Sequence, residues 1–171
     1  GVWTIQGGLT TAAATASTLT LNGTGADDSF TLRLSLTNDQ LLEVLFNSVT
    51  PVFTVPLNSL QRIDVNGLGG EDTLTVDSTH GAISLPGGIH FDGGPGGDTL
   101  ILTGGETNLT TSNTSGPETT LTIRDGTSNT DQVVVYQNVT TVTNNLPEAS
   151  VLEKTGDAMK DLLHWLGLVG S

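Results

Sequence analysis

Four aspartates that follow glycine-rich turns are the residues of this sequence best suited to chemistry. The turns read GTGADDSFT (23–31), GLGGEDTLT (67–75), GGPGGDTLI (93–101) and GTSNTDQVV (126–134), which align Asp28, Asp72, Asp98 and Asp131. A carboxylate in such a turn can accept hydrogen bonds from turn amides, or it can supply oxygen ligands to a hard cation such as Ca²⁺. The turns are therefore either structural corners or parts of a calcium site.

The calcium interpretation depends on turns that lie next to each other in space. Asp72 and Asp98 are 26 residues apart, and stacked turns of the chain would bring their carboxylates together. Ca²⁺ takes six to eight oxygen ligands, so more than one turn has to contribute. The candidate ligands, with the flanking acids included, are Asp28, Asp72, Asp98, Asp92 and Glu71.

Glycines shape these turns. Glycine adopts positive φ at no steric cost and lets a neighbouring backbone approach closely. We expect this role for Gly67, Gly70, Gly93, Gly94 and Gly96.

The segments between the turns indicate β-strands. Apolar and polar residues alternate in short runs that are rich in β-branched residues and end at Gly, Asn, Asp or Pro. Clear examples are TLTLNG (18–23), RIDVNG (62–67), DTLTVD (72–77) and DTLILTG (98–104). No helix pattern precedes about residue 145, so the sequence predicts an all-β domain over residues 1–145.

The recurrence of the turns favours a β-solenoid over other all-β folds. Successive aligned aspartates are 44, 26 and 33 residues apart, which a repeat of about 22 to 26 residues explains. The longest interval is then two coils, and the last contains an inserted polar loop at 107–120. The expected form is a right-handed parallel β-helix with Asp28, Asp72, Asp98 and Asp131 on related corners; a β-sandwich is the alternative.

The same turns carry a family resemblance. GGPGGDTLI (93–101) fits the nonapeptide G-G-x-G-x-D-x-U-x at every specified position, and GLGGEDTLT (67–75) differs only by Leu68 at the second glycine. Residues 18–145 thus resemble RTX-like, hemolysin-type calcium-binding repeats, and look like modules of large secreted surface proteins of planctomycetes and similar bacteria. The resemblance implies an extracellular β-solenoid with an adhesin-like or structural role and Ca²⁺ as a cofactor. Unlike true RTX arrays, the nonapeptides here are not in tandem.

The charge balance limits the partners. The 171 residues include 18 acidic and 5 basic ones, for a net charge of -13, and no cysteine. Nucleic acid binding is disfavoured because neutralising phosphates requires Lys and Arg. No run of about 20 apolar residues exists, so no membrane span is expected.

Enzymatic signals are weak. His80, His90 and His164 lack the spacing of metal ligands, so we expect no catalytic residues. A polysaccharide-active β-helix enzyme would need a row of carboxylates, for which Asp64, Asp77 and Asp92 are the candidates, with Arg33, Arg62 and Arg124 as the basic residues.

The end of the chain differs from the rest. Residues 146–171 contain apolar residues at helical spacing from Asp157 onward, which predicts a linker and a short amphipathic helix. This helix either caps the β-domain or contacts another subunit through Met159, Leu162, Leu163, Trp165 and Leu166.

Taken together, the sequence predicts a non-enzymatic extracellular module of a surface layer, adhesin or self-assembling fibre. We expect self-association, head to tail or through strand edges, because a solenoid exposes strand edges at its ends. The N-terminal stretch 4–21 carries no charge or proline that would block such pairing. The alternatives are a calcium-dependent carbohydrate-binding module and the polysaccharide-active enzyme.

Overall fold

The computed structural model describes residues 2–3, 11–15, 18–105, 107–125 and 130–147. Two mixed β-sheets account for most of them, together with one 3₁₀ turn, η1 (Leu57–Ser59), and no α-helix lies within these ranges. The first sheet, sheet A, has the order β1 (Val2–Trp3), β2 (Thr11–Thr15), β3 (Thr18–Asn22), β7 (Arg62–Asn66), β9 (Ile89–Asp92), β13 (Asp131–Gln137), β12 (Glu118–Asp125) and β11 (Thr107–Ser115). The second sheet, sheet B, has the order β14 (Thr141–Asn145), β10 (Thr99–Thr103), β8 (Thr73–Asp77), β4 (Ser29–Ser35), β5 (Asn38–Phe46) and β6 (Phe53–Pro56).

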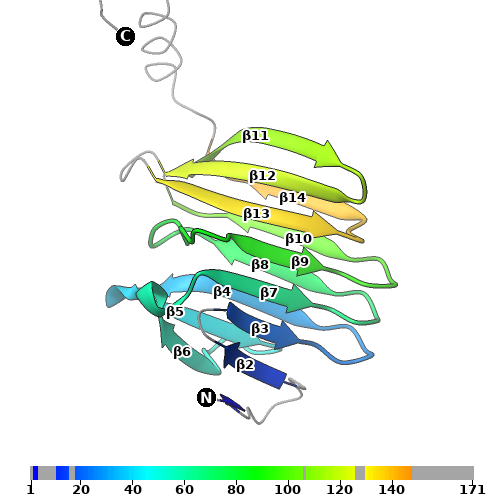
Figure 1. Cartoon of the computed structure of the whole chain (residues 1–171), viewed down its shortest axis with the longest axis horizontal. Helices are drawn as coiled ribbons and strands as arrows, with labels where there is room; N and C mark the ends of the chain where they lie inside the picture. Colours follow the sequence, from blue (N-terminus) through cyan, green and yellow to red (C-terminus); the bar gives the residue numbers. More distant parts are fainter. Residues whose placement is uncertain (1, 4–10, 16–17, 106, 126–129, 148–171) are drawn as a thin grey trace, which may run out of the picture.

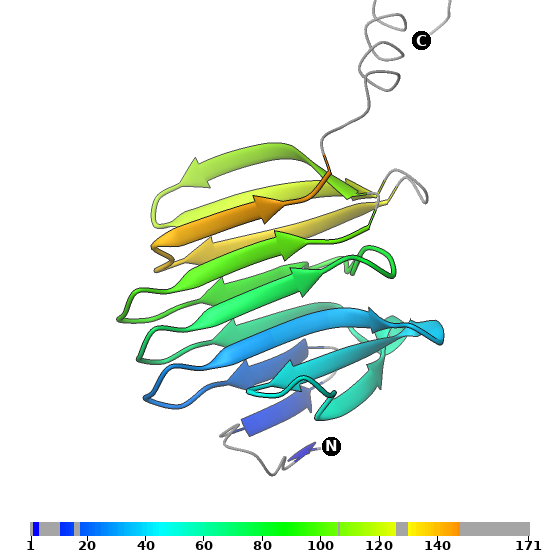
Figure 2. The ribbon, with the colours of Figure 1, turned by 180° about the vertical axis from the view of Figure 1, so that it is seen from behind.

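Parallel strands occupy the centre of both sheets. In sheet A, β3, β7, β9 and β13 pair in parallel; in sheet B, β4, β8, β10 and β14 do the same. Each parallel strand of sheet A leads through a short connection into a parallel strand of sheet B, and the connections lie one above another along one side of the molecule (Figures 1 and 2).

Antiparallel strands extend the sheets at their ends. β5 and β6 continue sheet B beyond β4, while β12 and β11 continue sheet A beyond β13. The segment at 107–120, which we expected to be a polar loop, therefore contains β11 and the start of β12. Its Thr, Ser and Asn residues suit a two-stranded arm with β-branched threonines, and the loop expectation is wrong.

The core lies between the two sheets. Alternate residues point inward, so the burial pattern of β3, β7, β8 and β10 is strictly period two. Equivalent inward residues stack in columns, such as Phe30, Leu74 and Leu100 in sheet B. Fully burying a side chain of this kind contributes about 1.5–3 kcal/mol. One continuous apolar cluster contains residues of both sheets.

The all-β expectation is confirmed, and two sheets that share one core fit the sandwich-like alternative. Residues 148–171, including the expected helix and its apolar residues Met159, Leu162, Leu163, Trp165 and Leu166, lie outside the described residues.

Candidate functional site

Three of the four predicted turns form a stack of equivalent corners. The corners comprise residues 23–28, 67–72 and 93–98, and each connects a sheet-A strand to a sheet-B strand. Backbone hydrogen bonds join them: Gly23 N–H donates to Asn66 O at 2.8 Å, and Gly67 N–H donates to Asp92 O at 2.8 Å. Asp131 is not at such a corner, because it is the first residue of β13 in sheet A. Its expected equivalence to the other three aspartates is wrong.

The corner aspartates form a ladder of side-chain to backbone hydrogen bonds. Asp28 N–H donates to Asp72 Oδ1 at 2.8 Å, and Asp72 N–H donates to Asp98 Oδ1 at 2.8 Å. All three side chains are buried. Hydrogen bonds of a backbone amide to a carboxylate are stronger than those between neutral groups. Asp72 and Asp98 therefore each accept a hydrogen bond from a backbone amide of the preceding corner.

Glycine is required at the first position of each corner because the next corner approaches it closely. A Cβ on Gly23 would lie 2.6 Å from Gly67 O and 2.7 Å from Asp28 Oδ2. A Cβ on Gly67 would overlap Asp72 Oδ2 and lie 2.5 Å from Gly93 O. The predicted turn role of Gly67 and Gly93 thus has a specific cause, which is the space that the aspartate and the stacked carbonyl occupy.

The other predicted glycines serve the same packing. Gly70 and Gly94 adopt positive φ, at 114° and 88°. A Cβ on Gly96 would collide with the carbonyl oxygen of Gly70 in the preceding corner.

An asparagine from outside the repeat ends the ladder at the Asp28 corner. No corner precedes that of Asp28, so its carboxylate does not accept from the amide of an earlier corner. Asn47 Nδ2 instead donates to Asp28 Oδ1 at 2.8 Å. The Asn47 side chain also accepts from Ser29 N–H at 2.8 Å. Asn47 has a φ of 47°, a conformation that asparagine tolerates better than most residues. No sequence signal in the repeat pointed to Asn47.

The other end of the ladder has no aspartate. The strand register places Thr141 beside Thr99, so Thr140 occupies the position equivalent to Asp98. Thr140 N–H donates to Asp98 O at 2.9 Å. The fourth corner is therefore the short connection at 138–140, which contains neither glycine nor aspartate and was missed for that reason.

The ladder leaves few oxygens for a cation. Oδ2 of Asp72 and Oδ2 of Asp98 are buried without a hydrogen-bond partner. Among the described residues, no group of three or more His, Cys, Asp or Glu side chains could hold a metal ion. Ca²⁺ takes six to eight oxygen ligands, so a cation at these two carboxylate oxygens would also need backbone carbonyls or water.

The other two predicted calcium ligands, Asp92 and Glu71, are not part of the aspartate ladder. Asp92 accepts from Gln137 Nε2 at 2.7 Å and from Asn138 Nδ2 at 2.8 Å. Glu71, an exposed residue of the second corner, donates its N–H to Asp27 Oδ1 at 2.8 Å. The structure thus brings Asp28, Asp72 and Asp98 together and directs Asp92 to another surface.

Burial is the largest electrostatic influence on Asp72, the middle aspartate of the ladder. It raises the pKa of the Asp72 carboxyl above its ordinary value. The hydrogen bond from Asp28 N–H opposes this change, and the negative charges of Asp98 and Asp28 add to it.

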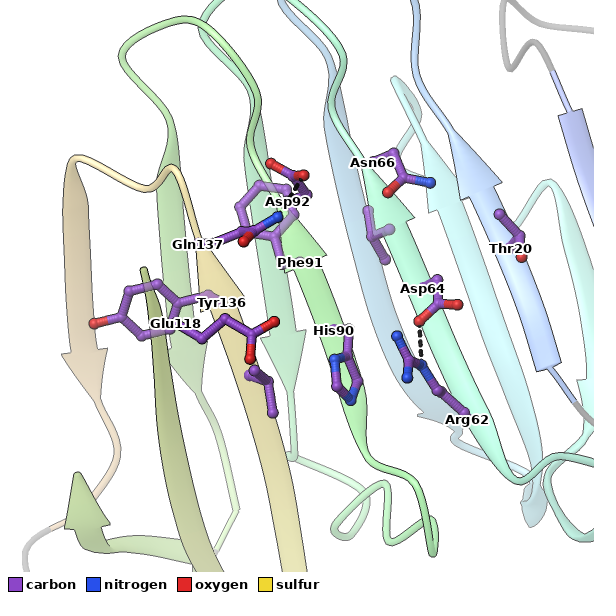
Figure 3. A pocket seen from close by; sticks show the side chains of 12 residues that line it. Thr20, Arg62, Asp64, Asn66, His90, Phe91, Asp92, Glu118, Tyr136 and Gln137 are labelled. Carbon is purple, nitrogen blue, oxygen red and sulfur yellow. Dashed lines mark hydrogen bonds and ion pairs between the residues drawn. The ribbon is translucent and has the colours of Figure 1, made fainter. Parts of the chain in front are cut away.

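A shallow polar groove lies on the outer face of sheet A. Its volume is about 200 Å³. Figure 3 shows the side chains that line it, which come from β7, β9, β12 and neighbouring strands. The ionisable and amide side chains among them are Arg62, Asp64, Asn66, His90, Asp92, Glu118 and Gln137.

Some of the side chains that line this groove were predicted from the sequence. Of the predicted carboxylate row, Asp64 and Asp92 line it, whereas Asp77 belongs to β8 in sheet B and lies outside it. Glu118 and Tyr136 were not predicted, because the hairpin of β11 and β12 that brings Glu118 to the groove was taken for a loop.

No protein-family model, curated protein or solved structure matches this chain. Within the described ranges, no helix combines the length and the apolarity needed to cross a bilayer.

Proposed function

We propose that this chain is a structural, adhesive module of an extracellular surface protein, and that its strand edges join copies into larger assemblies. The single observation that carries the proposal is that β14 ends sheet B and has β10 as its one partner among the described strands. The resemblance to repeats of secreted surface proteins supports an extracellular location.

The central strands support a short solenoid as the scaffold of the module. Each of four repeats would consist of a sheet-A strand, a corner and a sheet-B strand: β3 and β4, β7 and β8, β9 and β10, and β13 and β14. In-register parallel pairing between successive repeats, and the aspartate ladder along the corners, fit this arrangement. A right-handed course is expected, because parallel crossover connections are right-handed in nearly all proteins.

The edge of β14 has the properties of an unprotected strand. Its sequence TVTNN contains no charge and no proline, and among the described strands β10 is its one partner. Val142 occupies a position equivalent to the buried Leu100 but is 39% exposed. Unblocked edges of this kind recruit strands from other chains.

The other edges differ in their protection. β6, at the opposite end of sheet B, contains Pro56, and Pro51 lies just before it. Proline removes a ladder donor and is a common edge-blocking residue. β11, the edge of sheet A beside the last repeat, is nine residues long and uncharged. The end of the molecule that contains β11 and β14 is therefore the favoured site of association.

A charge placed on the β14 edge tests the proposal. Thr141 N–H donates to Asp98 O on the β10 side, so the N–H of Val142 points to the open edge because strand amides alternate. The variant Val142→Lys adds a charge there, and Val49→Lys makes the same change at a residue that is 92% exposed in the loop after β5. Sedimentation velocity over a concentration series compares both variants with the intact wild-type chain.

We expect the wild type and Val49→Lys to associate with increasing concentration, and Val142→Lys to remain monomeric. Matching thermal unfolding of the two variants ensures that the comparison concerns folded protein. A wild-type chain that stays monomeric at several hundred micromolar contradicts the assembly proposal. Equal association of both variants would show that the contact between copies does not involve β14.

A calcium-dependent carbohydrate-binding module is the second candidate function. The groove on sheet A favours it, because carboxylate, amide and guanidinium groups gather there. The calcium part rests on the resemblance and on the two unpartnered Oδ2 atoms of the corners. A polysaccharide-active enzyme would use the same groove.

A further inference from the structure

We propose that the groove on sheet A binds a segment of a neutral, hydroxyl-rich glycan chain, without any metal ion. This inference is independent of the proposed self-association, because the groove lies on the face of sheet A and the β14 edge belongs to sheet B.

The arrangement of polar groups suits a chain of sugar hydroxyls. Thr20, Asp64 and His90 are register partners on β3, β7 and β9, and Asn66 and Asp92 form a second row beside them. Neighbouring strands are about 4.8 Å apart, so the groove presents donors and acceptors at regular short intervals. Carboxylates and amides can each bond two adjacent hydroxyl groups, which gives orientation as well as affinity.

Several of these groups are already held in place. Asp64 forms an ion pair with Arg62. Asp92 is bonded by Gln137, by Asn138 and by Gly94 N–H at 3.1 Å. Groups fixed before binding lose less conformational entropy on binding, so modest contacts suffice for measurable affinity.

His90 and Glu118 keep bonding capacity for a ligand. His90 Nε2 lies 3.0 Å from Gly87 O, and because a carbonyl only accepts, Nε2 is the donor. In the neutral ring, Nδ1 is then left as an acceptor. The Glu118 carboxylate has no hydrogen bond or ion pair with the described residues, and Figure 3 shows it in the groove on the same side as the His90 ring.

Charge and shape decide the class of ligand. The groove contains three carboxylates, from Asp64, Asp92 and Glu118, against the guanidinium of Arg62. Together with the net charge of -13, this repels acidic glycans and nucleic acids. A shallow, open groove of about 200 Å³ does not enclose a small molecule but can accept part of a longer chain.

The test uses the intact chain and defined oligosaccharides in buffer with EDTA. The neutral probes are hexamers of glucose, mannose, xylose and N-acetylglucosamine units, and the acidic probes are oligogalacturonate and oligoalginate. Isothermal titration or affinity electrophoresis measures binding to the wild type, His90→Ala and Glu118→Ala. The controls are Thr75→Ala, on the outer face of sheet B, and Asp39→Ala, an exposed acid in β5.

We expect at least one neutral hexamer to bind, and both groove variants to weaken its binding about tenfold or more while both controls leave it unchanged. Failure of every neutral hexamer to bind at millimolar concentration overturns the proposal. So does tighter binding of an acidic probe, or loss of binding in EDTA that calcium restores. Shortened products after prolonged incubation would show that the groove is an active site, which also contradicts the proposal.

Discussion

At the scale of single residues, the corner aspartates act mainly as acceptors for backbone amides. Asp72 connects both neighbours: its Oδ1 accepts from Asp28 N–H, and its own N–H donates to Asp98. Removing the carboxylate leaves the Asp28 amide buried without its partner, which costs about 1–3 kcal/mol. The aspartate side chains should therefore matter more for stability than other acids of the chain.

Replacing Asp72 by alanine tests this role. We expect Asp72→Ala to lower the free energy of unfolding by about 1–3 kcal/mol in chemical denaturation. Asp39→Ala, which removes an exposed acid, should change it by less than about 0.5 kcal/mol. Equal small effects in both variants would mean that the ladder contributes nothing to stability.

The raised pKa of Asp72 predicts a pH dependence with a definite sign. Between its ordinary value of about 3.9 and the raised value in the folded state, the folded protein binds more protons than the unfolded protein. The part of the free energy of unfolding that is linked to protonation of Asp72 is therefore fully present below that window and is lost as pH rises through the folded pKa.

Asp72→Asn removes this titration while it keeps an oxygen for the Asp28 amide. We expect the stability of Asp72→Asn relative to the wild type to rise as pH increases from about 4 to neutrality. Thermal unfolding of both proteins across this range gives the difference directly. A difference that does not vary with pH contradicts the raised pKa.

Glycines of the corners offer a second residue-scale prediction. Gly67→Ala should lower the free energy of unfolding by about 1–3 kcal/mol, because its methyl group would overlap Asp72 Oδ2 and crowd Gly93 O. Gly25→Ala is the matched control: an added Cβ there has no neighbour within 4 Å. That control should be neutral or more stable by up to about 1 kcal/mol.

At the scale of elements, Asn47 joins the end of β5 to the start of β4. Its side chain bonds Asp28 Oδ1 and Ser29 N–H, and its own N–H donates to Ser29 O at 2.9 Å. The hairpin of β4 and β5 thus closes the ladder at a place where a further repeat would otherwise stack.

Asn47→Ala should weaken this closure. Two side-chain hydrogen bonds are lost, each with a net contribution of about 0.5–1.5 kcal/mol, and alanine is less suited to the φ of 47°. We expect faster amide hydrogen exchange in β4 and β5 and a lower melting temperature. Asn58→Ala, at an exposed position in η1, should leave both unchanged.

The strands of the centre could be predicted from the sequence, while β11 and the contacts of the other flanking strands could not. Strict alternation in TLTLN (18–22) and TLTVD (73–77) reflects one buried face, and the Gly-to-Asp motif marks three corners correctly. Asp131 was misplaced because a motif of one glycine and one aspartate also arises by chance at a strand start. Asn47 and Glu118 are brought to their sites by hairpins, whose contacts depend on register and not on a local motif.

At the scale of the whole molecule, charge opposes assembly. Two copies that each have a net charge of -13 repel each other, and salt screens this repulsion. If the β14 edge joins copies, association should increase between about 20 and 500 mM sodium chloride. Sedimentation at fixed protein concentration measures it. Association that decreases with salt would indicate ion pairs at the contact, contrary to an uncharged strand edge.

Calcium stabilisation would also act on the whole molecule. A ligand that binds only the folded state raises its stability by mass action. Because the corners offer two free carboxylate oxygens, we expect 10 mM calcium chloride to leave the melting temperature unchanged relative to EDTA. A rise that Asp98→Ala abolishes would instead establish the calcium site that the resemblance implies.

The aspartate ladder also makes the length of the molecule adjustable. Each corner bonds only to its immediate neighbours, and the chain distance from Asp72 to Asp98 is 26 residues. A duplicate of residues 67–92 inserted after Asp92 would meet, on both sides, the contacts that its original already makes. Each such duplication would lengthen the stack by one strand spacing of about 4.8 Å. Duplication of this segment in the gene would thus lengthen the module in small, equal steps, and no new type of contact would be needed.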